Sequence, residues 1–261
     1  MDEQAVSIGQ DLGNAVDFDV LRDGMWVGIF RRSNGLFVVS SYGFEFALDP
    51  AVRFPLVRFV DRDRVVVVST RSRRDGSPSC ISSLDGTTRV PLAVGDGIED
   101  AIVLSDLIAV TYFDEGVFSG IPPSEQGIAF FDFEGHLCAG YRSLFGADAV
   151  DLADGYAACR VDHHTIGFSA YDGFDLVCAN PRARTRRARA LPRSLHGASA
   201  LTIKRDTAFF FSPYNSKGVL LELSAGGVVR EIGRHPGPLR GLECGRFLSI
   251  GEHGFTVITC G

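Results

Sequence analysis

Short runs of apolar, β-branched and aromatic residues recur along the whole chain, separated by tight polar turns. Runs of this length and composition predict β-strands. The 3.6-residue spacing of an amphipathic helix is nearly absent, so we predict an all-β chain. The clearest runs, which we interpret as the second strands of a repeated unit, cover residues 25–30, 64–69, 107–113, 156–161, 207–211 and 246–250.

Two series of turn residues mark the same repeat. The turns that precede these runs hold Asp23, Asp63, Asp106, Asp154 and Asp206, and in the sixth case Cys244 and Gly245. The second series, at the next tight turn along each unit, holds Gly43, Gly86, Gly135, Gly173 and Gly227. Asp bonds its own main chain or tolerates left-handed backbone angles, and Gly supplies a positive φ, so both suit tight turns. Two series in phase predict a unit of four short strands.

A unit of about 40–50 residues with four short strands is typical of a β-propeller blade. The chain accommodates six units, so we predict a single β-propeller domain with blades near residues 14–54, 55–97, 98–146, 147–196, 197–236 and 237–261. The last unit stops before its fourth strand, whereas residues 1–10 hold a segment that resembles the fourth strands of other units. We therefore predict that the N-terminal strand closes the last blade, which protects its edge and brings the termini together.

The register is open over residues 174–196. Residues 174–178 fit the fourth strand of the fourth blade, followed by a long arginine-rich connector. They also fit its third strand, paired with residues 185–191 across the Asn180-Pro181 turn. A count of five or seven blades therefore remains an alternative to six.

The in-phase units resemble the β-propeller class over essentially the whole chain. They lack the Trp-Asp pairs of WD40 repeats and the double-glycine pattern of kelch repeats. Residues 110–118, followed by residues 127–135, resemble a stretch of uncharacterised bacterial propeller-like proteins. This resemblance implies a propeller fold and a bacterial, cytosolic origin, and it implies no known activity.

Composition and charge argue against several function classes. The formal net charge is −6, so the basic balance typical of nucleic-acid-binding proteins is missing. No apolar run has the length of a membrane span, and the first ten residues lack the basic and apolar regions of a secretory signal. The six cysteines form no C-x-x-C pair and have no metal-ligand spacing with histidine. We therefore expect a soluble, cytoplasmic protein with no cofactor, no metal, no membrane partner and no nucleic-acid partner.

One segment is locally basic, because six arginines lie between residues 182 and 193. Few aromatic residues accompany them, unlike in a typical single-strand nucleic-acid site. We interpret the segment as a solvated edge strand whose charges discourage pairing with other sheets.

Loops between the second and third strands hold most of the unusual polar residues. The longest covers residues 114–126 and combines two acids, aromatic residues and a Pro-Pro pair. Long loops on a rigid scaffold often carry function. The binding residues that we predict on this rim are Tyr112, Asp114, Glu115, Phe118, His163, His164 and Tyr214.

We predict a non-catalytic binding or interaction module, a monomer that presents this rim to an unknown protein or small-molecule ligand. The alternative is a hydrolase or lyase with a polar site at the mouth of the central channel. Carboxylates and histidines supply general acids and bases, so its catalytic residues would be Asp114, Glu115, His163 and His253. Convergence of these four side chains around a pocket would favour the enzyme.

Overall fold

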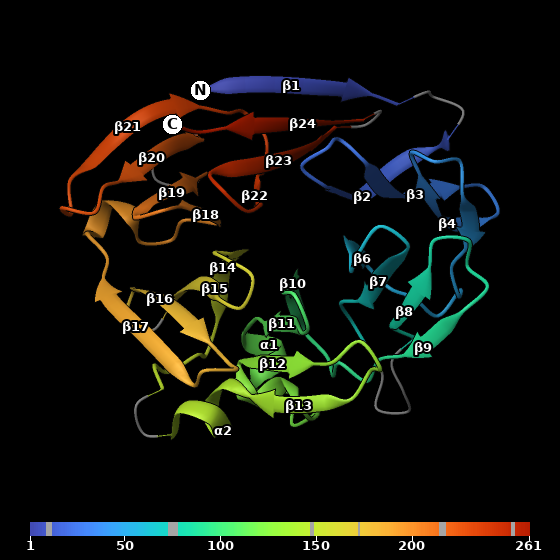
Figure 1. Cartoon of the computed structure of the whole chain (residues 1–261), viewed down its shortest axis with the longest axis horizontal. Coiled ribbons are helices and arrows are strands. Elements are labelled where there is room, and N and C mark those ends of the chain that lie inside the picture. Colours follow the sequence, from blue (N-terminus) through green and yellow to red (C-terminus); the bar gives the residue numbers. More distant parts are fainter. Residues whose placement is uncertain (9–11, 73–77, 147–148, 172, 214–217, 252–253) are drawn as a thin grey trace.

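A closed ring of β-sheets forms the body of the molecule in this computed structural model (Figure 1). The structure describes all residues except 9–11, 73–77, 147–148, 172, 214–217 and 252–253, and it leaves the side chains of residues 155–156 undescribed. Within the described residues, the strands make six antiparallel sheets of four strands each. The chain is therefore a six-bladed β-propeller, as the repeat predicts.

Each blade runs outwards from the central channel, with its first strand innermost (Figure 1). The first blade consists of β2 (Asn14–Val20), β3 (Trp26–Arg32), β4 (Gly35–Ser40) and β5 (Glu45–Ala47). The second consists of β6 (Pro55–Phe59), β7 (Arg64–Ser69), β8 (Cys80–Ser83) and β9 (Arg89–Pro91). The third consists of β10 (Ile98–Val103), β11 (Ile108–Tyr112), β12 (Ile128–Phe131) and β13 (Leu137–Gly140). The next two consist of β14 (Gly155–Arg160), β15 (Ile166–Ala170), β16 (Asp175–Asn180) and β17 (Thr185–Ala190), and of β18 (Ala200–Lys204), β19 (Thr207–Ser212), β20 (Val219–Leu223) and β21 (Val229–Arg234).

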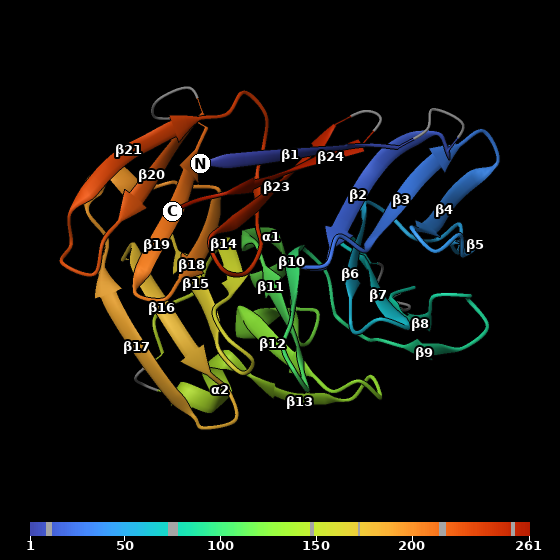
Figure 2. The same ribbon diagram turned by 45° about the horizontal axis from the view of Figure 1, so that its top comes forward.

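The sixth blade closes the ring with strands from both ends of the chain. Its inner strands are β22 (Arg240–Gly241), β23 (Arg246–Gly251) and β24 (Gly254–Thr259), and its outermost strand is β1 (Asp2–Ser7). All six residues of β1 pair with β24. The two termini accordingly lie side by side at this blade (Figure 1 and Figure 2). The predicted closure by the N-terminal strand is confirmed.

The strand pairing in the fourth blade shows which of the two open registers is right, and it also shows that the predicted strand order in this blade was shifted by one strand. β16 pairs with β17 across the Asn180-Pro181 turn, so the hairpin alternative is right. However, β14 is the first strand of this blade, whereas the turn pattern predicts residues 156–161 as the second. Its first turn therefore holds Asp162 and not Asp154. The helix α2 (Tyr141–Phe145) lengthens the preceding connector, and an Asp in a connector looks like an Asp in a turn.

The core lies between neighbouring blades. In β7, the four consecutive residues Val65–Val68 are all 0% exposed, because both faces of this strand pack against other blades. An aromatic cluster covers the join between the sixth and first blades. The ring centroid of Phe18 lies 5.2 Å from that of Phe255 and 5.3 Å from that of Phe30. The interface that closes the ring is thus apolar.

The ring has two faces, because the strands of each blade alternate in direction. The turn face carries the turns between first and second strands, such as residues 21–25, 104–107 and 161–165. The connector face carries the loops between second and third strands and the blade-to-blade connectors, including α1 (Asp114–Val117) and α2. None of the helices in the described part of the chain has the length and apolar character needed to span a membrane.

Candidate functional site

The loop of residues 114–126 folds into a lobe on the connector face. It contains α1 and the short 3-10 helix η2 (Ser124–Gln126). The Phe113 N–H donates to the Gly97 carbonyl at 3.0 Å, and the Ser124 Oγ donates to the Asp96 carbonyl at 2.9 Å. The lobe is therefore attached to the connector that leads into β10.

Further contacts tie this lobe to the second blade. Gly116 lies so close to Gly97 that a side chain at either position would overlap the main chain of the other. Arg71 forms an ion pair with Glu115 at 2.5 Å, and its guanidinium lies 5.4 Å from the centre of the Phe113 ring. These contacts make the lobe a fixed part of the scaffold.

A groove of about 360 Å³ runs beside the lobe. The lobe, β13 and α2 provide its walls, with Pro122, Glu125, Leu137, Leu144 and Arg184 among the lining residues. Leu137 is 51% exposed, and Oε2 of Glu125 is buried without a hydrogen-bond partner among the described residues. β13 is the outermost strand of its sheet, so one edge of its main chain is open.

The predicted binding residues near the lobe differ in exposure. Asp114, Glu115 and Phe118 are exposed on its surface, and Phe118 is 72% exposed. Tyr112 is 0% exposed, and its hydroxyl donates to the Val94 carbonyl at 2.6 Å. Its ring thus belongs to the core, where a surface ligand does not reach it. Tyr214 lies outside the described residues.

His163 and His164 lie on the turn face and not on the rim with the lobe. Nδ1 of His163 is 3.1 Å from Ser105 Oγ, and Nδ1 of His164 is 3.5 Å from Asp106 Oδ1. Both partners come just before β11, whereas the lobe begins just after it. The full length of a strand therefore separates the histidines from the lobe. The prediction that these histidines share a rim with the lobe was wrong, because the strand before them is the first of its blade and not the second.

The four residues of the enzyme alternative are consequently not brought together. Asp114 and Glu115 are exposed on the connector face, His163 is on the turn face, and His253 lies outside the described residues. Within the described residues, no three His, Cys, Asp or Glu side chains are grouped so as to hold a metal ion.

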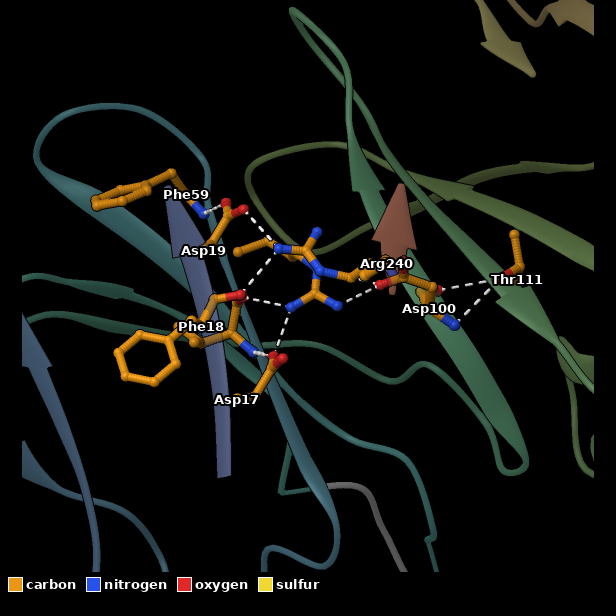
Figure 3. Close-up of polar contacts among 10 residues, drawn as sticks. Asp17, Phe18, Asp19, Phe59, Asp100, Thr111 and Arg240 are labelled. Carbon is orange, nitrogen blue, oxygen red and sulfur yellow. Dashed lines mark hydrogen bonds and ion pairs between the residues drawn. The ribbon is translucent and has the colours of Figure 1, made fainter. Parts of the chain in front are cut away.

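The central channel holds a buried ion-pair network that the sequence analysis missed (Figure 3). Arg58 on β6 donates to Asp17 Oδ2 at 2.5 Å and to Asp100 Oδ1 at 2.5 Å. These three side chains are 4%, 6% and 11% exposed, respectively. Burial by itself would lower the pKa of Arg58, but the carboxylates of Asp100 and Asp17 raise it above its ordinary value. Arg58 therefore stays charged and links the first three blades.

A second ion pair in the channel links the sixth blade to the first. Arg240 donates from Nη2 to Asp19 Oδ1 at 2.9 Å and to the Phe18 carbonyl at 2.8 Å (Figure 3). The Phe59 N–H donates to the other oxygen of Asp19 at 2.9 Å. Burial by itself would raise the pKa of Asp19, but Arg240 and Arg58 lower it below its ordinary value. The Asp19 carboxylate is therefore ionised in the neutral pH range.

The sequence does contain a signal for this network. Arg58 is 41 residues from Asp17 and 42 residues from Asp100, which matches the length of one blade. Charged residues thus recur at similar places in the innermost strands, where a blade core alone would favour apolar ones. Aligning the repeats on their first strands would have found them.

On the connector side of the network, the channel widens into a cavity of about 180 Å³. Its lining includes Asp17, Glu99 and Asp100. Glu99 projects from β10 into this open space. The side chain of Glu99 is exposed to the solvent of the channel, but desolvation by the channel walls, together with the charges of Asp100 and Asp154, raises its pKa to about 7. Because solvent reaches the carboxyl group, we expect this shift to have a small effect on stability.

Replacing Glu99 by glutamine should remove a pH-dependent loss of stability. The folded protein holds the Glu99 proton more tightly than the unfolded chain, so the wild type loses stability as the pH rises from 4.5 through about 7. The melting temperature of the variant minus that of the wild type should therefore be larger at about pH 8 than at about pH 5. Thermal unfolding across this range measures the difference, with the exposed turn residue change Glu134→Gln as control. Parallel pH profiles for E99Q and wild type would contradict the prediction.

Several solved structures share the propeller fold of this chain. Virginiamycin B lyase from Staphylococcus aureus aligns with a TM-score of 0.55 and 11% identity, covering 100% of this chain and 99% of that one. A chain of a mitotic checkpoint complex aligns with a TM-score of 0.56 and 10% identity, covering 98% and 94%. A chain of a nidogen/laminin complex gives 0.51 and 12%, covering 84% and 78%. At these identities the likeness shows the fold alone. No family model and no curated protein matches the sequence.

Proposed function

We propose that the protein is a non-catalytic binding module that holds an extended segment of a protein partner in the groove beside the lobe. The observation that carries this proposal is the open edge of β13 next to a groove of about 360 Å³. An extended segment adds to such an edge as a further strand, with main-chain hydrogen bonds giving affinity and flanking pockets giving specificity.

The lining of the groove suits such a segment. The exposed side chain of Leu137 offers an apolar contact, and the unpartnered Oε2 of Glu125 offers a buried acceptor to an N–H group or a basic side chain. The guanidinium of Arg184 offers a partner to a carboxylate. Because main-chain contacts hold the lobe in place, little ordering cost opposes binding. Asp114, Glu115 and Phe118 would extend the contact over the exposed side of the lobe.

The hydrolase or lyase alternative has less support. A general acid and a general base must both lie within hydrogen-bond reach of one substrate. The acids of the lobe and His163 lie on opposite faces of the ring. A similar structure that is a lyase adds no support for catalysis at 11% identity.

Replacing Leu137 by aspartate should weaken binding of an extended peptide at least about tenfold, which equals about 1.4 kcal/mol. The change removes an apolar contact and adds a carboxylate to the groove near Glu125. Peptides selected from a random library on the immobilised wild-type protein would serve as probes, with fluorescence anisotropy as the measurement. Val228, a similarly exposed apolar residue in a turn of the fifth blade, supplies the matched control Val228→Asp. Equal binding by L137D and wild type would count against the groove.

The proposal includes a monomeric, cytoplasmic protein without a nucleic-acid partner. The net charge of −6 opposes binding to a phosphate backbone, and the arginines of β17 lie on the outermost strand of their sheet. All six cysteines are free thiols, which suits a reducing compartment.

A further inference from the structure

The turn-face end of the channel is a second, chemically different cavity. Its volume is about 80 Å³, room for a few water-sized groups. Four arginines reach its lining from different strands or turns: Arg58, Arg160, Arg240 and Arg246. Among the described residues, the carboxylates of Asp19 and Glu243 line it with them. Arg58 is already committed to Asp17 and Asp100 on the other side.

Each of the two carboxylates of this cavity already has more than one hydrogen-bond or ion-pair partner. Asp19 accepts from Arg240 and from the Phe59 N–H. Glu243 accepts from Arg160, pairs with Arg22 at 2.6 Å and lies 3.6 Å from Arg246. Four guanidiniums, those of Arg22, Arg160, Arg240 and Arg246, thus face two carboxylates. Together with Arg58 and its partners Asp17 and Asp100, five guanidiniums face four carboxylates, which leaves one positive charge in excess.

Two hydrogen-bond donors in the cavity also lack partners. The Nε atoms of Arg240 and Arg246 are buried, and neither has an acceptor among the described residues. The side chains of these two arginines are only 17% and 15% exposed. Buried donors without acceptors cost free energy, so a ligand that supplies acceptor oxygens gains by satisfying them. Burial and the nearby Arg22 charge also lower the pKa of Arg246. A bound anion would oppose this effect by stabilising the charged guanidinium.

We propose that this cavity binds a phosphate group, either as inorganic phosphate or at the end of a small phosphate ester. The excess positive charge favours an anion, and the oxygens of a phosphate group match the fork geometry of guanidinium groups. The recessed position of the arginines favours a small ligand that inserts into the channel over a flat macromolecular surface. The site lies in the central channel and shares no lining residue with the peptide groove, which follows the outermost strand of the third blade, so it is independent of the function proposed above.

Phosphate should bind to this site and stabilise the folded protein. Isothermal titration calorimetry with inorganic phosphate, at an ionic strength held constant with chloride, should give a saturable signal. At about 100 times its Kd, phosphate should raise the melting temperature by roughly 5–10 °C. Ribose 5-phosphate separates the two sources, because a bound ester shows that the cavity mouth admits more than the free ion. Acetate, a monoanion, should bind at least about tenfold more weakly. Saturable binding of acetate as tight as that of phosphate would overturn the assignment of the site to a phosphate group.

The matched variants are Arg246→Gln and Arg230→Gln. Arg230 is an exposed arginine of β21 that pairs with Glu222, far out in the fifth blade. R246Q should lower phosphate affinity at least about tenfold, while its melting temperature without phosphate stays equal to or above that of wild type, because an excess charge is removed. R230Q should bind phosphate like wild type. If R246Q fails to fold, Arg160→Lys keeps the charge but removes the fork and should also weaken binding. No phosphate signal in the wild type, or equal affinities in wild type, R246Q and R160K, would overturn the proposal.

Discussion

Replacing Arg58 by methionine should lower the free energy of unfolding by about 3–5 kcal/mol at neutral pH. Methionine fills much of the same space, so the main effect is that Asp17 and Asp100 lose their buried counter-charge. Breaking a buried ion pair from one side costs far more than removing a surface pair. Chemical denaturation with urea, followed by fluorescence of Trp26 in the first blade, measures the loss.

The pH dependence and two controls make this prediction specific. Burial raises the pKa of Asp17 and the charge of Arg58 lowers it, so without Arg58 this carboxyl group binds its proton more tightly in the folded state and the loss should shrink as the pH falls. Adding Asp17→Asn and Asp100→Asn should restore part of the stability, because no uncompensated charge is then buried. Arg62→Met, which removes an arginine with a 62% exposed side chain, should cost less than about 1 kcal/mol. If R58M and R62M have equal free energies of unfolding, the buried network does not contribute to the stability of the ring.

Deleting residues 1–7 should lower the free energy of unfolding by about 2–4 kcal/mol, because the backbone hydrogen bonds between β1 and β24 are lost. The deletion leaves β24 as an exposed edge strand and opens the link between the sixth and first blades. We therefore also expect concentration-dependent association of the shortened protein. Urea denaturation and analytical ultracentrifugation measure the two effects.

A side-chain control separates strand pairing from side-chain chemistry at this blade. Glu3 and Gln4 are both exposed on β1, so the double change Glu3→Ser and Gln4→Ser keeps the pairing and should cost less than about 1 kcal/mol. A synthetic peptide with the sequence of residues 1–7 should restore part of the lost stability when added to the shortened protein. An unchanged unfolding midpoint after the deletion would show that closure by β1 does not hold the ring together.

The channel has opposite electrostatic character at its two ends. Asp17, Glu99 and Asp100 line the connector end, whereas Arg160 and Arg246 line the turn end. Arg58 and Arg240 contribute to both linings. This polarity explains why the connector end is expected to respond to pH and the turn end to anions.

Much of the fold was predictable because it follows from local chemistry. Asp and Gly turns and apolar runs repeat at the length of a blade, and each requires only neighbouring residues to form. The closing strand was predictable for the same reason, since β1 resembles the fourth strands of other blades. The fourth blade was out of phase because turn chemistry does not distinguish a hairpin turn from a connector, as Asp154 illustrates.

The site was less predictable. The lobe of residues 114–126 stood out by length and composition, but its groove also depends on the contiguous segment of β13 and α2 and on Arg184, which lie elsewhere in the sequence. The two histidines were placed on the wrong face, because one misassigned strand moves the adjacent turn to the other face of the ring.

The sequence by itself determined an all-β propeller, its closure by the N-terminal strand and the position of its longest loop, since these depend on patterns within one blade. Only the tertiary structure decided the face on which each loop lies and the charges that meet in the channel. Asp17, Arg58 and Asp100 lie more than 40 residues apart from one another, and they pair only because the blades pack side by side around a common axis.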